Sequence, residues 1–285
     1  MPIHITALYT YPIKSCARLE HQQLTLDERG PVYDRRWMVI SDAPGEENQF
    51  LTARELPRLA VVQPRFEGDT LALTAPGMPE VRLPLAQQRP ADREVVVWDD
   101  TVRALDEGAT LARWFSDFLG APARLVRLSD DADRPVNLKY ARAAAQVGFA
   151  DGYPLLLALT ESLDDLNRRL AARGKATLPM SRFRPNVVVS GSGQPWAEDT
   201  WSRIVAGDIR FDVVKPCARC VMTTIDPATG TIPDHQEPLA TLATFRKAAK
   251  GVMFGQNVIH RALGTLRVGE TVAVVETAEA FETVG

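Results

Sequence analysis

The chain has 285 residues, 45% of them apolar, and its 33 basic and 36 acidic side chains give a net charge of −3 at pH 7. A chain of this length and apolar content can build one large globular domain or two ordinary ones. The acidic balance excludes the broad basic surface by which proteins hold nucleic-acid backbones, so we expect no nucleic-acid partner and only local anion sites.

The sequence also carries signals about its compartment. Residues 1–6 lack the basic and apolar regions of a secretion signal. The longest strongly apolar run, residues 153–159, is far shorter than the roughly 20 residues that span a bilayer. Three cysteines, an odd number, fit a reducing compartment better than a disulfide framework. We therefore expect a cytoplasmic protein without a membrane partner.

Short strands dominate the predicted secondary structure, because runs of β-branched and aromatic residues alternate with Gly and Pro. In chain order, strands are predicted at residues 3–9, 37–41, 59–63, 70–74, 94–98, 125–128, 186–190, 209–215, 221–226 and 265–276. Strand signals at this density indicate a mostly β protein built from sheets or barrels.

Three helices are predicted between these strands. The first covers residues 107–119, the second begins after Thr160 as its N-cap and ends at Gly174, and the third extends from Pro238 to Gly251. Each carries large apolar residues at helical spacing, which we interpret as core packing rather than a cofactor site.

The segment 129–145 separates two regions of the chain. It is rich in Asp, Arg and Ala and has few large apolar residues, which is typical of a linker or loop. We therefore predict an N-terminal domain at residues 1–125 and a C-terminal domain at residues 126–285.

Cys217 and Cys220 are two of only three cysteines. Pro216 lacks an N–H for a sheet ladder, so we expect the preceding strand to end there and residues 217–220 to form a turn. Arg219, between the thiols, would favour the thiolate, which attacks electrophiles or binds soft metals. Two thiols cannot complete a zinc site, which needs about four ligands. The pair is then a redox dithiol, a metal ligand or two buried structural cysteines, and its position at strand ends disfavours the last.

Basic residues also border the predicted strands. Lys14 and Ser15 follow the first strand, Arg35 precedes the second, and Arg184 precedes the strand that begins at Asn186. If these strand ends converge, they form a positively charged pocket with amide donors. Such a pocket suits a phosphate-bearing ligand, because Arg binds phosphate with two parallel hydrogen bonds and Lys acts as a point charge.

Several segments together resemble the motifs of one family, the MOSC-domain molybdenum enzymes that include bacterial YcbX and the mitochondrial amidoxime-reducing component. In the family's order, they are YPIKSC (residues 11–16), DRRW (34–37), FLTAR (50–54), FRPN (183–186) and KPCARC (215–220). DGYP (151–154) and FGQN (254–257) also fall where the bacterial members carry similar sequences. The resemblance extends from residue 1 to about residue 275.

The resemblance implies an α+β, mostly β fold, in which a MOSC β-barrel domain packs with an N-terminal β-barrel-like domain and a molybdenum cofactor (Mo-molybdopterin) lies between them. It implies that Cys220 is the metal ligand and the catalytic residue, and that Cys217 supports it. The residues matched to cofactor-binding positions are Lys14, Ser15, Arg35, Asp151, Gly152, Tyr153, Arg184, Asn186, Ala218 and Arg219.

Three of these positions depart from the family pattern. Gly152 and Tyr153 stand where the mitochondrial members carry hydroxyl residues, and Ala218 replaces a serine of the relatives. A side-chain contact to the cofactor is lost at such a position, although a backbone N–H can replace it.

The resemblance implies an enzyme that reduces small N-hydroxylated compounds, in which two electrons and two protons convert N–OH into N–H and water. The sequence after residue 276 has no cysteines for an iron–sulfur domain. We therefore expect an external ferredoxin- or flavoprotein-like electron donor. Two alternatives remain open: a molybdenum-cofactor or sulfur carrier with a persulfide on Cys217 or Cys220 and no turnover of its own, and a β-rich binding protein with buried cysteines.

Overall fold

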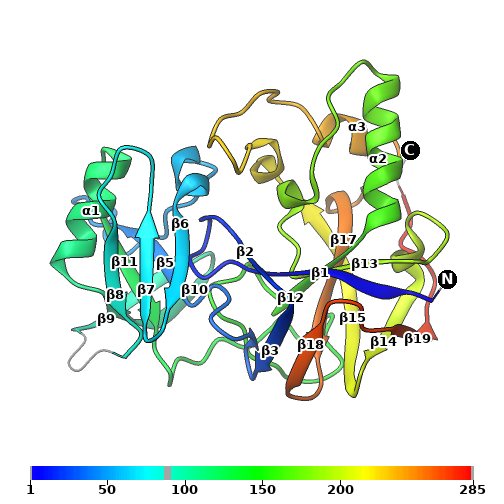
Figure 1. The fold of residues 1–285 in the computed structure, drawn as a ribbon, viewed down its shortest axis with the longest axis horizontal. Helices are drawn as coiled ribbons and strands as arrows, with labels where there is room; N and C mark the ends of the chain where they lie inside the picture. Colours follow the sequence, from blue (N-terminus) through cyan, green and yellow to red (C-terminus); the bar gives the residue numbers. More distant parts are fainter. Residues whose placement is uncertain (1, 87–90, 284–285) are drawn as a thin grey trace.

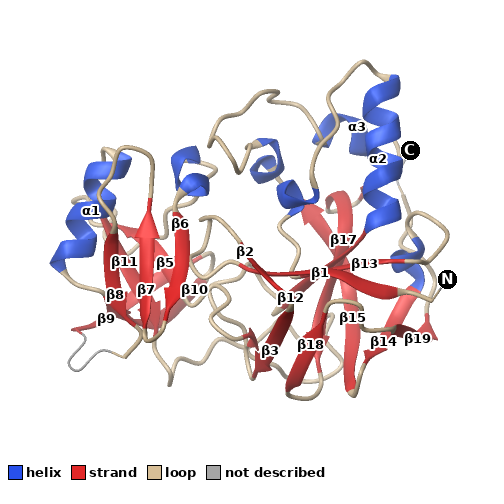
Figure 2. Cartoon of the chain, in the orientation of Figure 1, coloured by secondary structure: helices blue, strands red, loops and turns tan. Residues whose placement is uncertain are grey.

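The computed structural model describes residues 2–86 and 91–283, and it has an α+β, mostly β fold, as the sequence predicts (Figures 1 and 2). The described strands form four sheets. The largest sheet has the order β19 (Val272–Thr277), β14 (Trp201–Ala206), β15 (Ile209–Arg219), β17 (Gly251–His260), β12 (Leu155–Leu159), β13 (Val187–Ser190), β1 (His4–Thr10) and β2 (Leu19–His21), with β16 (Lys247–Ala248) paired to β17.

The other three sheets are smaller. One has the order β18 (Gly264–Arg267), β3 (Gln23–Asp27) and β4 (Gly30–Pro31); a second has β6 (Gln63–Glu67), β7 (Thr70–Thr74) and β8 (Val81–Pro84); the third has β5 (Trp37–Ser41), β11 (Ala123–Leu128), β10 (Asp100–Asp106) and β9 (Ala91–Val97). The helices are α1 (Ala109–Leu119), α2 (Thr160–Ala172) and α3 (Leu239–Ala243), with 3-10 turns η1 (Pro57–Val61), η2 (Met180–Phe183), η3 (Ala197–Thr200) and η4 (Val221–Thr224).

These elements form two bodies (Figure 1). The N-terminal body consists of α1, the β5-β11-β10-β9 sheet and the β6-β7-β8 sheet. The C-terminal body consists of the largest sheet, the β18-β3-β4 sheet, α2 and α3. Strand order does not follow chain order, because β1 pairs with β13 and β3 pairs with β18. The first strands of the chain are thus part of the C-terminal body, and the boundary between residues 125 and 126 stays a prediction.

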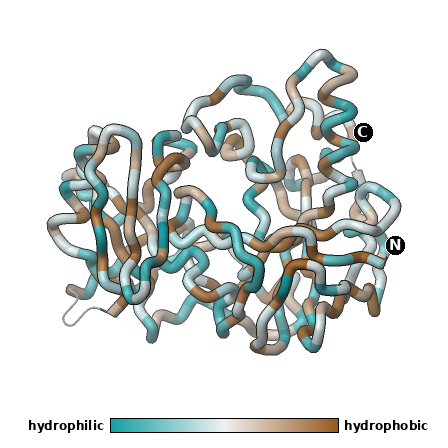
Figure 3. The backbone as a smooth tube through the Cα atoms, viewed as in Figure 1, coloured by the Kyte–Doolittle hydropathy of each residue, from teal (hydrophilic) through white to brown (hydrophobic). Residues whose placement is uncertain are grey.

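Hydrophobic residues, coloured brown in Figure 3, occur along the strands of both bodies. The core of the N-terminal body also includes Ile13, from the segment after β1, and Ile225, which follows η4. Side chains from distant parts of the sequence therefore share one buried cluster, and its burial holds the two bodies against each other.

The first two predicted helices are confirmed. Leu111, Trp114, Phe115 and Phe118 of α1 are buried as expected, and Gly120 closes the helix in the left-handed conformation. In α2 the predicted apolar stripe is buried, but Thr160 is the first helical residue rather than the N-cap. The helices in the described ranges are all too short or too polar to cross a membrane.

The prediction that Pro216 ends its strand is wrong. β15 continues to Arg219, and its pairing with β17 shifts register between Val213 and Lys215 and again between Pro216 and Ala218. Proline is tolerated at such bulges because the irregular ladder does not require its N–H. Most of the Cys217–Cys220 segment therefore belongs to a bulged strand rather than to a turn.

Four other predicted elements also differ from the structure. Residues 221–226 begin with η4 rather than a strand, because the hydroxyls of Thr223 and Thr224 donate to nearby backbone carbonyls and favour a tight turn. Residues 59–63 lie mostly in η1, and the third helix is limited to α3 before the β16–β17 hairpin. Residues 265–276 form two strands, β18 and β19, with Gly269 at φ +87° between them.

Gly255 provides a test of the β12–β17 packing. Its φ is +73°, and a Cβ at this position would lie 2.8 Å from the carbonyl oxygen of Leu157. We expect Gly255→Ala to lower the free energy of unfolding in urea by about 2 kcal/mol or more, because backbone strain and steric overlap add. Gly269→Ala is the control, since its φ is also positive but no heavy atom lies within 4 Å. Equal losses in the two variants would contradict this account.

Candidate active site

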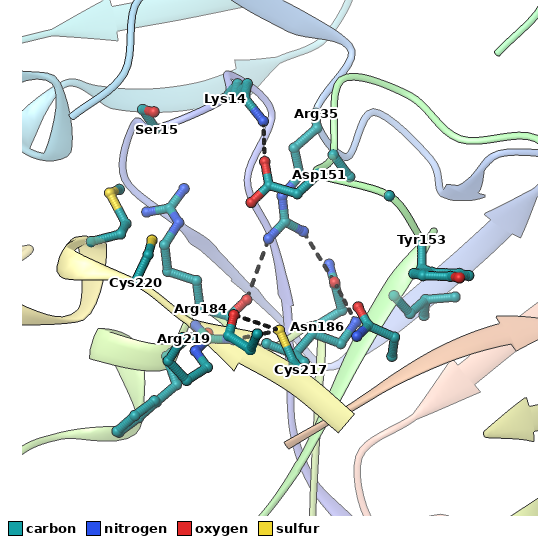
Figure 4. A pocket seen from close by; sticks show the side chains of 18 of the residues that line it. Lys14, Ser15, Arg35, Asp151, Tyr153, Arg184, Asn186, Cys217, Arg219 and Cys220 are labelled. Atoms are coloured by element: carbon teal, nitrogen blue, oxygen red, sulfur yellow. Dashed lines mark hydrogen bonds and ion pairs between the residues drawn. The ribbon is translucent and has the colours of Figure 1, made fainter. Parts of the chain in front are cut away.

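A pocket of about 890 Å³, counted with its open mouth, is lined by segments that are distant in sequence (Figure 4). All the residues that the sequence matched to the cofactor or the metal line it: Lys14, Ser15, Arg35, Asp151, Gly152, Tyr153, Arg184, Asn186, Ala218, Arg219 and Cys220. The fold therefore brings the predicted set together, while the role of each residue stays a prediction.

Lys14 is held at the pocket by both its backbone and its side chain. Its N–H donates to the carbonyl of Trp37 (2.8 Å), and its Nζ donates to the carbonyl of Phe149 (2.8 Å) and to Oδ1 of Asp151 (2.5 Å). Burial lowers the pKa of Lys14, and the Asp151 carboxylate offsets part of this effect. The next residue, Ser15, turns the chain with φ +72°.

Asp151 faces the open part of the pocket, with 75% of its side chain accessible to solvent. Its surroundings raise its pKa by desolvation, but the Lys14 charge, the hydrogen bonds from Lys14 and Trp98 and the Arg35 charge outweigh this effect and hold the pKa below its ordinary value. Asp151 is therefore a carboxylate at neutral pH, suited to fixing Lys14 rather than to donating a proton.

Arg35 and Arg184 flank the ring of Tyr11. Their Cζ atoms lie 4.2 Å and 4.1 Å from the ring centroid, and the ring is almost completely buried. Arg35 also donates to Oδ2 of Asp34 (2.6 Å), and Arg184 donates to the carbonyl of Cys16 (2.8 Å). Burial lowers the pKa of Arg184 to about 10 and raises that of Tyr11 to about 12. The ring thus holds two cations at the pocket wall through cation–π contacts.

The side chain of Asn186 forms its hydrogen bonds with other residues of the protein. Its Oδ1 accepts hydrogen bonds from Arg35 (3.0 Å) and from the N–H of Leu156 (3.1 Å), and its Nδ2 donates to the carbonyl of Tyr9 (3.1 Å). Only 1% of the residue is exposed. Asn186 therefore positions Arg35 and joins three strands of the largest sheet, so it shapes the pocket from behind.

The two neighbouring cysteines have different surroundings. Cys220 is exposed, whereas Cys217 is half-buried and accepts a hydrogen bond from Arg219 at 2.9 Å. The second terminal nitrogen of Arg219, Nη2, donates to the carbonyl of Phe183 (2.6 Å). All three cysteines are free, and Cys16 is buried with its pKa raised to about 12 by desolvation. The interpretation of the pair as two buried thiols is therefore wrong for Cys220.

Residues 2–86 and 91–283 give Cys220 no partners that would complete a metal site made of protein side chains. Among the described residues, no group of three or more His, Cys, Asp or Glu side chains is arranged to hold a metal ion. A metal bound by Cys220 would therefore need its remaining ligands from a cofactor or solvent.

Sequence reasoning missed several pocket residues. Thr52, Arg54, Phe183 and Asn257 line the pocket and lie inside motifs quoted above, so the motifs were the available signal. Met222 also lines the pocket but lies outside these motifs. Trp98, just outside this set, carried no signal, because only the folded chain brings it near Asp151.

Trp98 connects the N-terminal body to the pocket. It lies between β9 and β10 with φ +57°, a strained conformation for a bulky residue. Its Nε1–H donates to Oδ1 of Asp151 (3.2 Å), and the Cζ of Arg54 lies 4.4 Å from its ring centroid. Trp98 therefore helps to orient Asp151 and Arg54.

Comparison with known proteins defines the class of the chain. Residues 3–122 match the MOSC N-terminal beta barrel domain, and residues 144–273 match the MOSC domain. The chain is thus built from these two domains.

Curated relatives match nearly the whole chain. It is 36% identical to mitochondrial amidoxime-reducing component 1 of Mus musculus over 288 residues, which cover 94% of this chain and 81% of the relative. It is 34% identical to the Homo sapiens component 1 over 285 residues and to the Rattus norvegicus component 2 over 289 residues, each covering 94% of this chain and 82% of the relative. The chain therefore belongs to the amidoxime-reducing component family of MOSC-domain enzymes, which confirms the resemblance of its motifs.

The Tyr11 ring provides a test of the cation arrangement. We expect Tyr11→Leu to lower the free energy of unfolding by about 3 kcal/mol, because it removes ring volume and both cation–π contacts. Tyr11→Phe keeps the ring and loses only the hydrogen bond from the hydroxyl to the Pro185 carbonyl (3.2 Å), so it should cost about 1 kcal/mol. Urea denaturation measures both variants, and equal losses would rule out the role assigned to the ring.

Proposed function

We propose that the chain is a molybdenum-cofactor-dependent reductase of small N-hydroxylated compounds that receives electrons from a separate redox protein. One observation carries the proposal: the exposed thiol of Cys220 shares a pocket with Lys14, Arg35, Arg184 and Arg219 in a protein of net negative charge. The printed names of the relatives, as amidoxime-reducing components, support this reaction class. We also propose a cytoplasmic location, on the basis of cysteine usage alone.

The residues present fit this cofactor. An anionic phosphate needs local cations, which Arg35, Arg184 and Lys14 would supply. Arg219 has a buried Nε without a hydrogen-bond partner within the described part of the chain, so it retains donor capacity near the pocket. The sulfur of Cys220 is a soft ligand suited to molybdenum.

Other proposed contacts use the backbone. Ser15, Gly152 and Ala218 line the pocket. Gly152 and Ala218 lack a polar side chain, so only their backbone N–H groups could donate to a cofactor. Tyr153 would contribute its ring to the pocket wall, because its hydroxyl is directed to the Asn137 carbonyl at 3.4 Å.

When bound, the cofactor supplies the two-electron redox chemistry of the reaction. In this reaction the N–O bond breaks, two electrons and two protons are taken up, and N–H and water are the products. Asp151 stays ionised and fixes Lys14, so we assign it no proton-donor role. Trp98 and Lys14 hold the Asp151 carboxylate in a fixed position beside the substrate space.

Replacement of Cys220 tests the proposal. We expect Cys220→Ser to lose bound molybdenum and to reduce benzamidoxime at least about 100-fold more slowly with reduced methyl viologen, because the metal loses its protein ligand. Cys217→Ser is the matched control and should retain the metal. Full turnover by Cys220→Ser would overturn the proposal, and a persulfide without molybdenum in the wild-type chain would favour the carrier alternative.

Trp98 tests the orientation of Asp151. Trp98→Phe keeps an aromatic ring beside Arg54 but removes the Nε1–H that donates to Asp151. A hydrogen bond to a charged group contributes about 1.5–3 kcal/mol, so we expect kcat/KM for benzamidoxime to fall by about 10-fold or more. The molybdenum content should stay at the wild-type level, and an unchanged kcat/KM would show that this hydrogen bond has no part in the reaction.

A further inference from the structure

Tyr140 is surrounded by lysine side chains at the protein surface. The Nζ atoms of Lys139, Lys215 and Lys250 lie 5.8 Å, 5.0 Å and 4.8 Å from its ring centroid. Lys250 also donates a hydrogen bond to the Tyr140 hydroxyl. Lys139 and Lys250 are exposed, as is the neighbouring Leu138, with 61% of its surface accessible. We refer to these five residues as the Tyr140 patch.

In the described part of the chain, no carboxylate forms an ion pair with the lysines of the Tyr140 patch. The chain has six lysines, and three of them meet here. Within the described ranges none of the three forms an ion pair, whereas Lys14 and Lys175 both contact carboxylates. The three ammonium groups lie around one ring and carry the same charge, so they repel one another. A protein with net charge −3 therefore keeps a local excess of positive charge at one place.

The Tyr140 patch adjoins the active-site pocket. The Nζ of Lys215 lies 5.5 Å from the ring centroid of Tyr153, which lines the pocket. Lys250 directly precedes Gly251, where an added Cβ would lie 3.7 Å from the Cβ of pocket-lining Ala218. The patch thus borders the part of β15 that leads to Cys220.

We infer that the Tyr140 patch is the docking surface for the electron donor, a carrier protein with acidic residues around its redox centre. This inference rests on the proposed function, because the reduction of N–OH consumes two electrons, which that proposal assigns to a separate redox protein. The donor's redox centre has to approach the cofactor, and the patch is a binding surface next to the pocket.

The chemistry of the patch fits such a transient complex. Complementary charges steer two proteins together and raise the association rate, with a strong dependence on ionic strength. A lysine ammonium on its flexible side chain acts as a point charge, whereas an arginine guanidinium is planar and donates two parallel hydrogen bonds. Point charges suit a weak complex that must dissociate after each electron transfer. Exposed Leu138 and the Tyr140 ring add apolar contact area near the charges.

Charge reversal tests the inference on the full chain loaded with its cofactor. The variants are Lys139→Glu and Lys250→Glu, both at exposed positions outside the pocket lining. The control is Arg113→Glu on α1, which makes the same charge change at an exposed residue with no ion pair among the described residues. Figure 1 shows α1 at the far side of the N-terminal body. The probe donor is an acidic plant-type [2Fe–2S] ferredoxin, and the small-molecule donor is reduced methyl viologen.

We expect the wild-type chain to bind this ferredoxin at low salt, with affinity that falls as ionic strength rises. Each lysine variant should weaken binding and lower kcat/KM for the ferredoxin by about 10-fold, because association loses electrostatic steering. The salt dependence should flatten in both variants. Arg113→Glu should stay within about twofold of the wild type, and benzamidoxime reduction with methyl viologen should stay within about twofold in every variant.

Three results would overturn the inference: no ferredoxin binding by the wild-type chain, equal losses in Arg113→Glu, or equal losses with methyl viologen. The last result would show that the lysines act on substrate or cofactor instead. The proposed function fails separately, if the wild-type chain does not reduce benzamidoxime even with methyl viologen. Ferredoxin binding still tests the docking surface in that case, because it requires no turnover.

Discussion

The active-site pocket depends on holding four positive side chains close together in a chain of net negative charge. Two of these cations contact carboxylates and two do not. Lys14 contacts Asp151, and Arg35 contacts Asp34. Arg184 and Arg219 donate instead to backbone carbonyls, and the Tyr11 ring separates Arg184 from Arg35. Because the carbonyls and the ring carry no full charge, the pocket keeps an excess of positive potential for an anionic ligand.

This arrangement requires backbone conformations that residues other than glycine rarely adopt. Seven described non-glycine residues have positive φ, and four of them, Ser15, Arg35, Trp98 and Arg184, lie in the pocket wall or beside it. Such strain persists only where surrounding packing fixes the chain. The buried cluster around Ile13 and Trp37 supplies that packing next to Lys14. The stability of the shared core is therefore what permits a strained, preorganised site.

The sequence predicts the parts of the structure that depend on local pattern. The α1 stripe and the residues of β5 and β7 follow from spacing, and the motifs identify most of the pocket. Predictions fail where tertiary pairing or side-chain chemistry decides. Pro216 is accommodated because β17 pairs with β15 through bulges, and Thr223 and Thr224 form a turn through their own hydroxyls. Trp98 could not be predicted, because its relation to Asp151 exists only after the two bodies pack.

Arginine and lysine have separate tasks around the pocket, and the difference follows from their chemistry. The half-buried arginines Arg35, Arg184 and Arg219 are held by contacts with aromatic rings and by hydrogen bonds, so their positions do not depend on a ligand. The lysines of the Tyr140 patch form no ion pairs in the described structure, and two of them, Lys139 and Lys250, are exposed. Rigid forks suit a cofactor that stays bound through many turnovers. Ammonium groups without ion pairs suit a partner that must bind and then dissociate. Positive charge therefore serves a lasting complex inside the pocket and a transient complex at its border.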